Sequence, residues 1–461
     1  MKLKRTIFTI VLLGISIVFL YFWQRTEEKK QEEIKSAKKI FAFNKEEIGE
    51  IGIKSDKGEI VLFKKEDGSW ELIKPVRAKA DYKVVSGIIE KLGEINLTGL
   101  FEVSPSQLSS YGLFPPKAEV NLSEGNKKNS FYLGEETPSA NSVYIKRDKE
   151  NRVLIVDRVI IPLLLKDVFE FRDKRVINFD RREINKIELI YPDKSKSFDL
   201  SKYSNEWQLQ RPMKTKADQE EVNKIFDLLL GLRVKKFEED EFQDNKRYSF
   251  HSPQLKILLD FNKGESETLF FGGGSEEGVY ARLGSKKEIY VVSGDILEKL
   301  PKKVFDLRNK KLAPFNSNEI ESIKLISKEK TIELEKGADD RWNIIEPVKT
   351  KGDTIEIGNL IYEIVNLRFK EFIDNVFLPP STIGIDSPER EIILKGKHKT
   401  HLVRIKIGKI DNNKYSSYAI NDLDNQLGMI DYTFVRDYLD LDLGKLKGKD
   451  IANRVPSPSR E

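Results

Sequence analysis

Cysteine is missing from all 461 residues of this chain. Its absence excludes disulfide bonds, thiolate catalysis and cysteine-ligated zinc or iron–sulfur sites. It says little about the compartment, because a periplasmic domain with an adequate core can do without disulfides. Histidine is scarce too, with three residues, so the usual general base is rare and no Ser/His/Asp arrangement recurs. We therefore expect a protein that is not an enzyme and has no catalytic residue.

A surplus of one charge is also lacking. The chain has 80 basic and 75 acidic residues, a net charge of +5, and Lys2, Lys4 and Arg5 supply three of those five positive charges. Nucleic-acid-binding proteins normally show a clustered basic surface, and no such stripe is visible along the sequence. We expect no nucleic-acid partner.

Long apolar runs are confined to one place, residues 7–23 (IFTIVLLGISIVFLYFW). As a helix this run measures ~25 Å, just enough to span the core of a bilayer. Because the basic residues lie in the short tail 1–6 before it, the positive-inside rule places that tail in the cytoplasm and the bulk outside. A cleaved signal peptide is the alternative, but the run exceeds a typical h-region, ends in bulky aromatics and lacks a small-x-small cleavage site. The sequence predicts a single-pass transmembrane anchor.

Internal repetition is what the chain has in abundance. A tryptophan, a proline five residues later and an aspartate six residues after that occur three times: Trp70/Pro75/Asp81, Trp207/Pro212/Asp218 and Trp342/Pro347/Asp353. The copies are spaced by 137 and then 135 residues, far longer than the ~20–50 residues of solenoid repeats. This period predicts three whole domains in tandem. We place them at residues 43–177, 178–313 and 314–448, after a charged stalk 24–42 and before a polar tail 449–461 predicted to be disordered.

Each copy has the pattern of an α+β domain. Alternating apolar residues between Asp/Gly turns predict three antiparallel strands, the third ending at the repeated proline. A helix follows, capped by the repeated aspartate, and a glutamate three residues on predicts a capping box in two copies, Asp218/Glu221 and Asp353/Glu356. Four more strands precede a closing helix capped near Asp157, Ser293 or Asp431. The expected order is β-β-β-α-β-β-β-β-α, a mainly antiparallel α+β domain with two helices per copy.

Few residues offer themselves for binding or chemistry. The repeated tryptophans could anchor a ligand and the repeated aspartates a cation, but a core position and a helix cap explain them better. His398 and His401 are spaced for a metal, yet they lie amid lysines that would repel a cation. The run 272–275 (GGGS) lacks the GK[ST] ending of a phosphate loop and is interpreted as a hairpin turn. We expect no metal and no cofactor.

Further residues repeat with the same step and carry a family resemblance. The elements in the first copy are Trp70/Leu72/Pro75/Ala80/Asp81, Tyr111-Gly112-Leu113 with Pro116, Leu133-Gly134 with Val143-Tyr144, and Phe169 with Arg172-Asp173-Lys174. Together they resemble a bacterial domain of unknown function, over residues 44–448. In the third copy Ile383 replaces the tyrosine, Gly352 replaces the alanine, and residues 441–444 lack the arginine found at 172 and 308. An interaction that depends on this arginine is therefore in doubt there.

The resemblance implies a setting for the protein. Domains of this family typically follow one N-terminal membrane anchor. They are often encoded beside an ATP-binding-cassette (ABC) transporter whose permease components resemble those of gliding-motility systems. The family has no established catalytic residues. We therefore expect a non-enzymatic accessory or scaffold protein in the bacterial inner membrane, with transporter or envelope proteins as partners. A membrane-tethered module that binds an envelope polymer or lipid is the alternative, and an envelope enzyme, which needs a clustered acid/base set, comes third.

Overall fold

A computed structural model describes residues 43–95, 97–241, 246–374, 378–440 and 442–448. The predicted anchor 7–23, stalk 24–42 and tail 449–461 lie outside the described residues. Within those ranges, no helix is long and apolar enough to cross a membrane. The described chain forms two compact units, one of residues up to 179 with 229–252 and 269–294, the other of 180–228, 253–268 and the residues from 295 onward.

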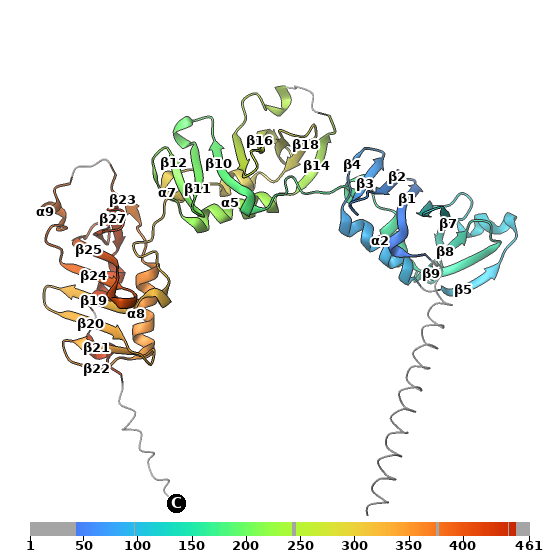
Figure 1. Cartoon of the computed structure of the whole chain (residues 1–461). Coiled ribbons are helices and arrows are strands. Elements are labelled where there is room, and N and C mark those ends of the chain that lie inside the picture. The colour runs from blue at the N-terminus through green and yellow to red at the C-terminus, as the bar shows by residue number, and fades with distance from the viewer. Residues whose placement is uncertain (1–42, 96, 242–245, 375–377, 441, 449–461) are drawn as a thin grey trace, which may run out of the picture. The chain divides into compact units, whose positions relative to one another are not determined.

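Three antiparallel sheets, each with nine strands in the described part of the chain, make up most of the structure (Figure 1). The first has the order β4 (Ala78–Lys79), β3 (Trp70–Lys74), β2 (Gly58–Lys64), β1 (Ile48–Ser55), β6 (Ala118–Glu124), β7 (Lys127–Glu136), β8 (Ser142–Arg147), β9 (Arg152–Asp157), β5 (Leu97–Glu102). The second has the order β13 (Thr215–Lys216), β12 (Glu206–Arg211), β11 (Phe198–Tyr203), β10 (Ile184–Ile190), β15 (Leu255–Phe261), β16 (Ser266–Ser275), β17 (Gly278–Leu283), β18 (Ile289–Val292), β14 (Val234–Glu239). The third has the order β22 (Thr350–Lys351), β21 (Trp342–Glu346), β20 (Thr331–Lys336), β19 (Ser322–Ser327), β24 (Arg390–Lys395), β25 (His401–Asp411), β26 (Ser416–Asn421), β27 (Leu427–Asp431), β23 (Glu371–Phe372). The shared order confirms three mainly antiparallel copies.

Each copy has two strands more than the seven predicted. One is a two-residue strand after the repeated proline, too short to show any periodicity. The other directly follows the long helix and crosses to the far edge of the sheet, where β5 pairs with β9, β14 with β18 and β23 with β27. This edge strand was missed because apolar and polar residues do not alternate along its sequence, as in the LTGLFE of β5, where side chains alternate only between half-buried and exposed.

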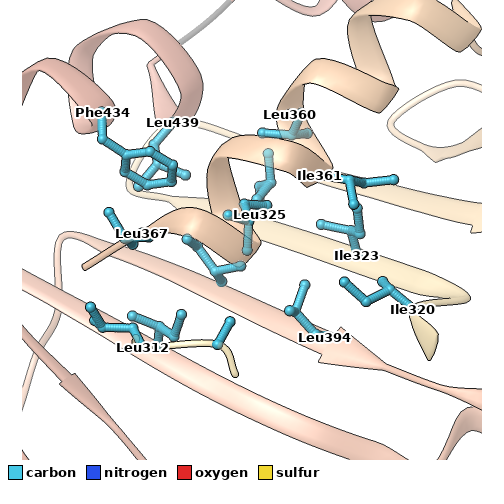
Figure 2. Close-up of a cluster of buried hydrophobic side chains, with 14 of the residues drawn as sticks. Leu312, Ile320, Ile323, Leu325, Leu360, Ile361, Leu367, Leu394, Phe434 and Leu439 are labelled. Atoms are coloured by element: carbon cyan, nitrogen blue, oxygen red, sulfur yellow. The ribbon is translucent and has the colours of Figure 1, made fainter. Parts of the chain in front are cut away.

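One 13-residue helix per copy packs on a face of its sheet: α2 (Tyr82–Glu94), α5 (Gln219–Gly231) and α8 (Thr354–Asn366). Figure 1 shows α2 beside β1–β4 and α8 beside β19–β22. In α8, the buried residues Ile357, Leu360, Ile361 and Ile364 follow helical spacing. Figure 2 shows Leu360 and Ile361 facing Ile323 and Leu325 of β19. The predicted periodicity of these helices is therefore the periodicity of core contacts.

Short helical pieces replace the single closing helix that the sequence predicted. The pieces are η3 (Arg158–Ile160), α3 (Ile161–Leu164) and α4 (Val168–Phe171), then α6 (Asp295–Lys299) and α7 (Val304–Leu307), then α10 (Tyr432–Phe434), the π-helix η9 (Val435–Leu439) and α11 (Leu443–Leu446). Connections between strands carry η1 (Lys45–Glu47), η2 (Pro105–Tyr111), η4 (Arg181–Glu183), η5 (Lys194–Lys196), η6 (Lys246–Tyr248), η7 (Ser317–Glu319), α9 (Pro380–Ile383) and η8 (Lys397–Lys399). Asp157 and Asp431 cap the first piece of their segments as expected.

The repeated tryptophans lie in the cores. Trp70, Trp207 and Trp342 expose 3%, 5% and 8% of their surface, each in the third long strand of its copy. The strand ends at the residue before the repeated proline, and the three peptide bonds that precede Pro75, Pro212 and Pro347 are cis. These positions leave no tryptophan face for a ligand.

The repeated aspartates cap the long helices, but without the predicted capping box. Asp81 accepts hydrogen bonds from the N–H groups of Lys83 and Val84, and Asp353 and Asp218 accept equivalent pairs. The N–H of each aspartate instead donates to the closing segment, at 2.8 Å, to the carbonyl of Phe171, Leu307 or Leu446. Because that N–H is already bonded, the glutamates three residues on have no donor to accept from. Each aspartate thus joins the start of its helix to the end of its copy.

Candidate interaction sites at the links between copies

The arginine after α4 reaches into the strand that follows the next copy's helix. Arg172 is 4% exposed, and its Nη1 donates to Oδ1 of Asp240 at 2.6 Å. Its guanidinium lies 3.5 Å from the ring centroid of Phe237 in β14. A planar guanidinium can stack on a ring and donate in its own plane at once, which an ammonium cannot do. We call this contact of Arg172, Phe237 and Asp240 the first link.

The arginine after α7 makes the same contact one copy later. Arg308 is 3% exposed, donates from Nη1 to Oδ2 of Asp374 at 2.6 Å, and stacks 3.6 Å from the ring of Phe372 in β23. Its Nη2 donates to Oε1 of Gln426 at 3.2 Å. We call this contact the second link. Each link lies inside one of the two compact units.

A second aromatic residue and a lysine complete each link. Phe169 packs edge-on against Phe237 at 5.8 Å between centroids, and Lys174 lies over the Phe169 ring. In the second link Phe305 packs on Phe372 at 5.8 Å, and a lysine lies over its ring in the same way. The phenylalanine and arginine of the closing Phe-x-x-Arg-x-Lys element therefore contact the neighbouring copy, and the lysine packs over the phenylalanine of its own copy.

The third copy carries a lysine where the first two carry the linking arginine. Ala80 and Arg172 form an antiparallel bridge, as do Ala217 and Arg308, and the third such bridge joins Gly352 to Lys447. The position equivalent to the arginine is therefore Lys447, after α11, and not within residues 441–444 as the sequence comparison suggested. The third copy is a few residues longer than the other two, by one residue between Asp431 and Lys447 and by two or three before Asp431, which moves the equivalent position along the chain.

Charged residues surround each link, and in the second link they neutralise one another. Arg368 donates to Asp218 at 3.0 Å and to Glu220 at 3.3 Å, and Lys311 donates to Glu220 at 3.2 Å. Lys311 and then Arg368 lower the pKa of the Glu220 carboxyl. Burial lowers the pKa of Lys310, despite the nearby carboxylates. Both carboxylates at this helix start thus have cationic partners from elsewhere in the chain.

The first link has an open pocket at the equivalent place. It measures about 490 Å³ and is lined by Asp81, Tyr82, Lys83, Asp173, Lys174, Arg175 and Arg233. Arg175 donates to both oxygens of Asp173 at 2.6–3.1 Å. Burial acts to raise the pKa of Asp173, but these hydrogen bonds outweigh it and the pKa is lowered. Arg233 donates to the backbone carbonyls of Leu230 and Leu232.

A close backbone approach explains two further elements of the family pattern. Gly134 faces the carbonyl oxygen of Tyr111, and Gly272 and Gly408 face those of Tyr248 and Ile383 in the same way. A methyl group at any of these glycines would lie well inside contact distance of that oxygen. The Leu-Gly pair and the Tyr-Gly-Leu element are therefore two sides of one contact, although they are far apart in the sequence.

The other residues that the sequence suggested for metal or phosphate binding do not form a site. Among the described residues no three metal-ligating side chains gather in a group. His401 Nε2 lies 2.7 Å from Asp422 Oδ2, while His398 sits at a left-handed turn before it. The glycine run 272–274 is not a hairpin turn as expected but the end of β16, and the turn lies between Ser275 and Gly278.

Sequence reasoning missed the partners of the arginines. Phe237 and Phe372 are 135 residues apart, the same step that separates the second and third tryptophans. This spacing was the available signal, but the first copy has Leu100 at the equivalent place in β5, so the pattern does not occur three times. Asp240 and Asp374 lie just past their strands, where acidic residues are common.

The strand order and the two links define a class of protein, a tandem array of antiparallel β domains joined by repeated contacts. The chain matches the family model described as "Domain of unknown function (DUF4340)" over residues 70–206 and 207–388. It belongs to this family. Both matched segments begin at a repeated tryptophan, Trp70 and Trp207, and the first ends where the second copy's tryptophan begins, while the second continues into the third copy.

Other comparisons add little. A search of curated proteins finds no match. Among solved structures, a DNA polymerase sliding clamp from Pseudomonas aeruginosa is 6% identical, with 86% of this chain and 94% of that chain covered and a TM-score of 0.17. The DNA polymerase III subunit beta from Pseudomonas aeruginosa is 7% identical, with 85% and 94% covered and a TM-score of 0.15. TM-scores this low show no shared fold, and no functional argument follows.

Proposed function

We propose that this protein is a membrane-anchored, extracytoplasmic scaffold or accessory component of an ABC-type transporter or envelope complex, with no enzymatic role. The observation that carries the proposal is the use made of the repeated residues. The tryptophans fill cores, the aspartates join helix starts to closing segments, and Arg172 and Arg308 bind the next copy. In a family of enzymes, repeated residues of these types would be expected in a catalytic site. Here they stabilise the domains and the contacts between neighbouring copies.

The links give such an array mechanical continuity. Both arginines are almost fully buried and stack on an aromatic ring while pairing with a carboxylate. Buried groups of this kind hold a defined geometry because breaking one partner leaves the other unsatisfied. A scaffold needs joints of this kind, since its function is to present several surfaces together.

Membrane attachment and the identity of the partner come from the sequence. The run 7–23 supplies the anchor, and the basic tail 1–6 supplies the orientation. Resemblance to anchored domains encoded beside ABC transporters supplies the class of partner. The alternative, a module that binds an envelope polymer or lipid, would use an open cleft with exposed aromatic rings, whereas the pocket at the first link is lined mainly by charged side chains.

Two experiments test the proposal. A reporter that is active only outside the inner membrane, fused after Glu461, should give signal, and deleting residues 1–23 should abolish that signal. Signal from a cytoplasmic reporter at the same position would defeat both the scaffold and the polymer-binding proposals.

The second experiment isolates the full chain, tagged at its C-terminus, from detergent-solubilised membranes. Permease and ATPase subunits should co-purify with it. The double variant Arg172→Ala/Arg308→Ala should lose them, whereas Arg341→Ala, which breaks an exposed pair with Asp339, should retain them. Co-purification of envelope polymer or lipid in place of transporter subunits would favour the alternative.

A further inference from the structure

The two links differ at one helix position, and this difference has a chemical consequence. The second residue after the capping aspartate is Lys83 in the first copy, Glu220 in the second and Ile355 in the third. The cations around it correspond, because the bridge of Arg175 with Arg233 in the first link matches that of Lys311 with Arg368 in the second. The nearby Asp173 of the first link corresponds to Asn309 in the second. The chain thus contains its own comparison of a site with and without a carboxylate.

In the second link the carboxylate at this position joins two cations. Glu220 accepts from Lys311 at 3.2 Å through one oxygen and from Arg368 at 3.3 Å through the other. Arg368 is fully engaged by carboxylates, since it also donates to Asp218. In this arrangement the two cations, Lys311 and Arg368, together bind one carboxylate.

In the first link that carboxylate is replaced by a cation. Lys83 lines the pocket with Lys174, Arg175 and Arg233, against Asp81 and Asp173. Asp173 forms an ion pair with Arg175. Arg175 is the equivalent of Lys311, one of the two cations that Glu220 binds in the second link. For Arg233 and Lys83, no carboxylate of the described residues lies within ion-pair distance. The pocket of about 490 Å³ therefore has an excess of positive charge exposed to solvent.

We propose that this pocket binds an acidic side chain of a partner protein, whose carboxylate lies beside Arg233 and Lys83 in the place that Glu220 holds in the second link. The internal comparison favours a carboxylate on a polypeptide, because that is the group bound by the equivalent residues. Arginine suits this role, since its planar fork matches a carboxylate with two parallel hydrogen bonds. Tyr82, which is 62% exposed at the rim, offers an apolar surface to the neighbouring part of such a segment. The inference does not rest on the proposed transporter role, because the charge of the pocket is the same whatever the partner.

The test measures binding of a fluorescently labelled tetraglutamate peptide to the full chain in neutral detergent, by anisotropy at moderate salt. Lys83→Glu and Arg233→Gln should each weaken binding at least about tenfold, the loss of one charge-assisted hydrogen bond. Lys128→Glu makes the same charge change as Lys83→Glu on an exposed strand position outside the pocket, and should leave the affinity unchanged. Melting temperatures of the variants establish that each is folded.

A gain-of-function variant makes the test sharper. Glu220→Lys gives the second link the lysine of the first, and should raise the stoichiometry from one peptide to two. Equal weakening by Lys83→Glu and Lys128→Glu would overturn the proposal, since it would show unspecific attraction. Binding of phosphatidylglycerol vesicles or of inorganic phosphate, without binding of the peptide, would overturn it in favour of a phosphate ligand. Failure of every probe to bind would overturn it as well.

Discussion

Replacing Arg308 by alanine should loosen the edge of the third sheet. The guanidinium of Arg308 donates to Asp374 and Gln426 and stacks on Phe372, which belongs to the edge strand β23. The neighbouring N–H groups of Lys370 and Ile373 hold that edge, donating to the carbonyls of Met429 and Leu427 in β27 at 2.8 and 2.9 Å. Local opening of these two hydrogen bonds is the quantity that the substitution should change.

The magnitude follows from what is lost and what is released. A hydrogen bond to a charged group contributes about 1.5–3 kcal/mol, and a desolvated cation–π contact contributes up to about 2 kcal/mol. Against these stands the cost of burying the guanidinium, which the alanine variant no longer bears. The side chain of Asp374 is 44% exposed, so water replaces much of its lost partner. We expect a net loss of about 2 kcal/mol in local opening free energy, which is about 30-fold faster exchange.

Hydrogen–deuterium exchange on peptides that cover residues 369–373 is the assay. Arg308→Lys should recover only part of the protection, because an ammonium keeps the charge but not the planar stacking. The control is Arg341→Ala, which removes a 71% exposed partner of the 64% exposed Asp339 in the same copy and should cost no more than about 1 kcal/mol. If Arg308→Ala and Arg341→Ala had equal effects on this segment, or if Arg308→Lys matched the wild type, the link would not have the role given to it.

Three further substitutions test other parts of the fold. Trp207→Ala should lower the free energy of unfolding by about 3–5 kcal/mol, seen as a lower urea midpoint, and an unchanged midpoint would contradict its burial. Gly272→Ala places a methyl group against a backbone carbonyl and should cost about 1–3 kcal/mol, whereas Gly274→Ala, with open space around it, should not, and equal melting temperatures would refute the close approach. The hydrogen bond from Lys370 lowers the pKa of Asp431 from 3.8 to about 2, so their pairing stabilises the fold fully above about pH 4 and not below pH 2. Lys370→Ala should therefore shift the urea midpoint at pH 5 and not at pH 2, and a shift of the same size at both would exclude this linkage.

The core of each copy could be predicted from the sequence because it repeats a strong period. The α8 residues Leu360 and Ile364 stood out at helical spacing, and both are buried. The capping role of Asp353 was predictable because it immediately precedes that period. The capping box was not, since the N–H of the aspartate bonds to a carbonyl 93 residues away, at Leu446, and such a partner leaves no local signal.

The links were beyond sequence reasoning for a different reason. The arginines were visible as part of a repeated element, but their partners lie in or just past the edge strands β14 and β23, whose sequences show no alternation of apolar and polar residues. The position of Lys447 was not recognised because the third copy is a few residues longer than the other two, mostly before Asp431, which changes the spacing. The charged pocket could not be predicted because the sequence does not show which surface lysines and arginines have a carboxylate partner. Only the structure shows that Arg368 pairs with carboxylates and that Arg233 pairs with none among the described residues.

The links also set how the chain can grow. The middle copy both receives an arginine at its edge strand, through Phe237, and supplies one at its close, Arg308. The two ends differ: the first copy presents Leu100, 50% exposed, where Phe237 and Phe372 receive an arginine, and the last carries Lys447 in place of the arginine. A gene that duplicated its middle segment would therefore encode a longer chain with both terminal copies unchanged. The number of interior copies can therefore vary without any change in the first or the last copy.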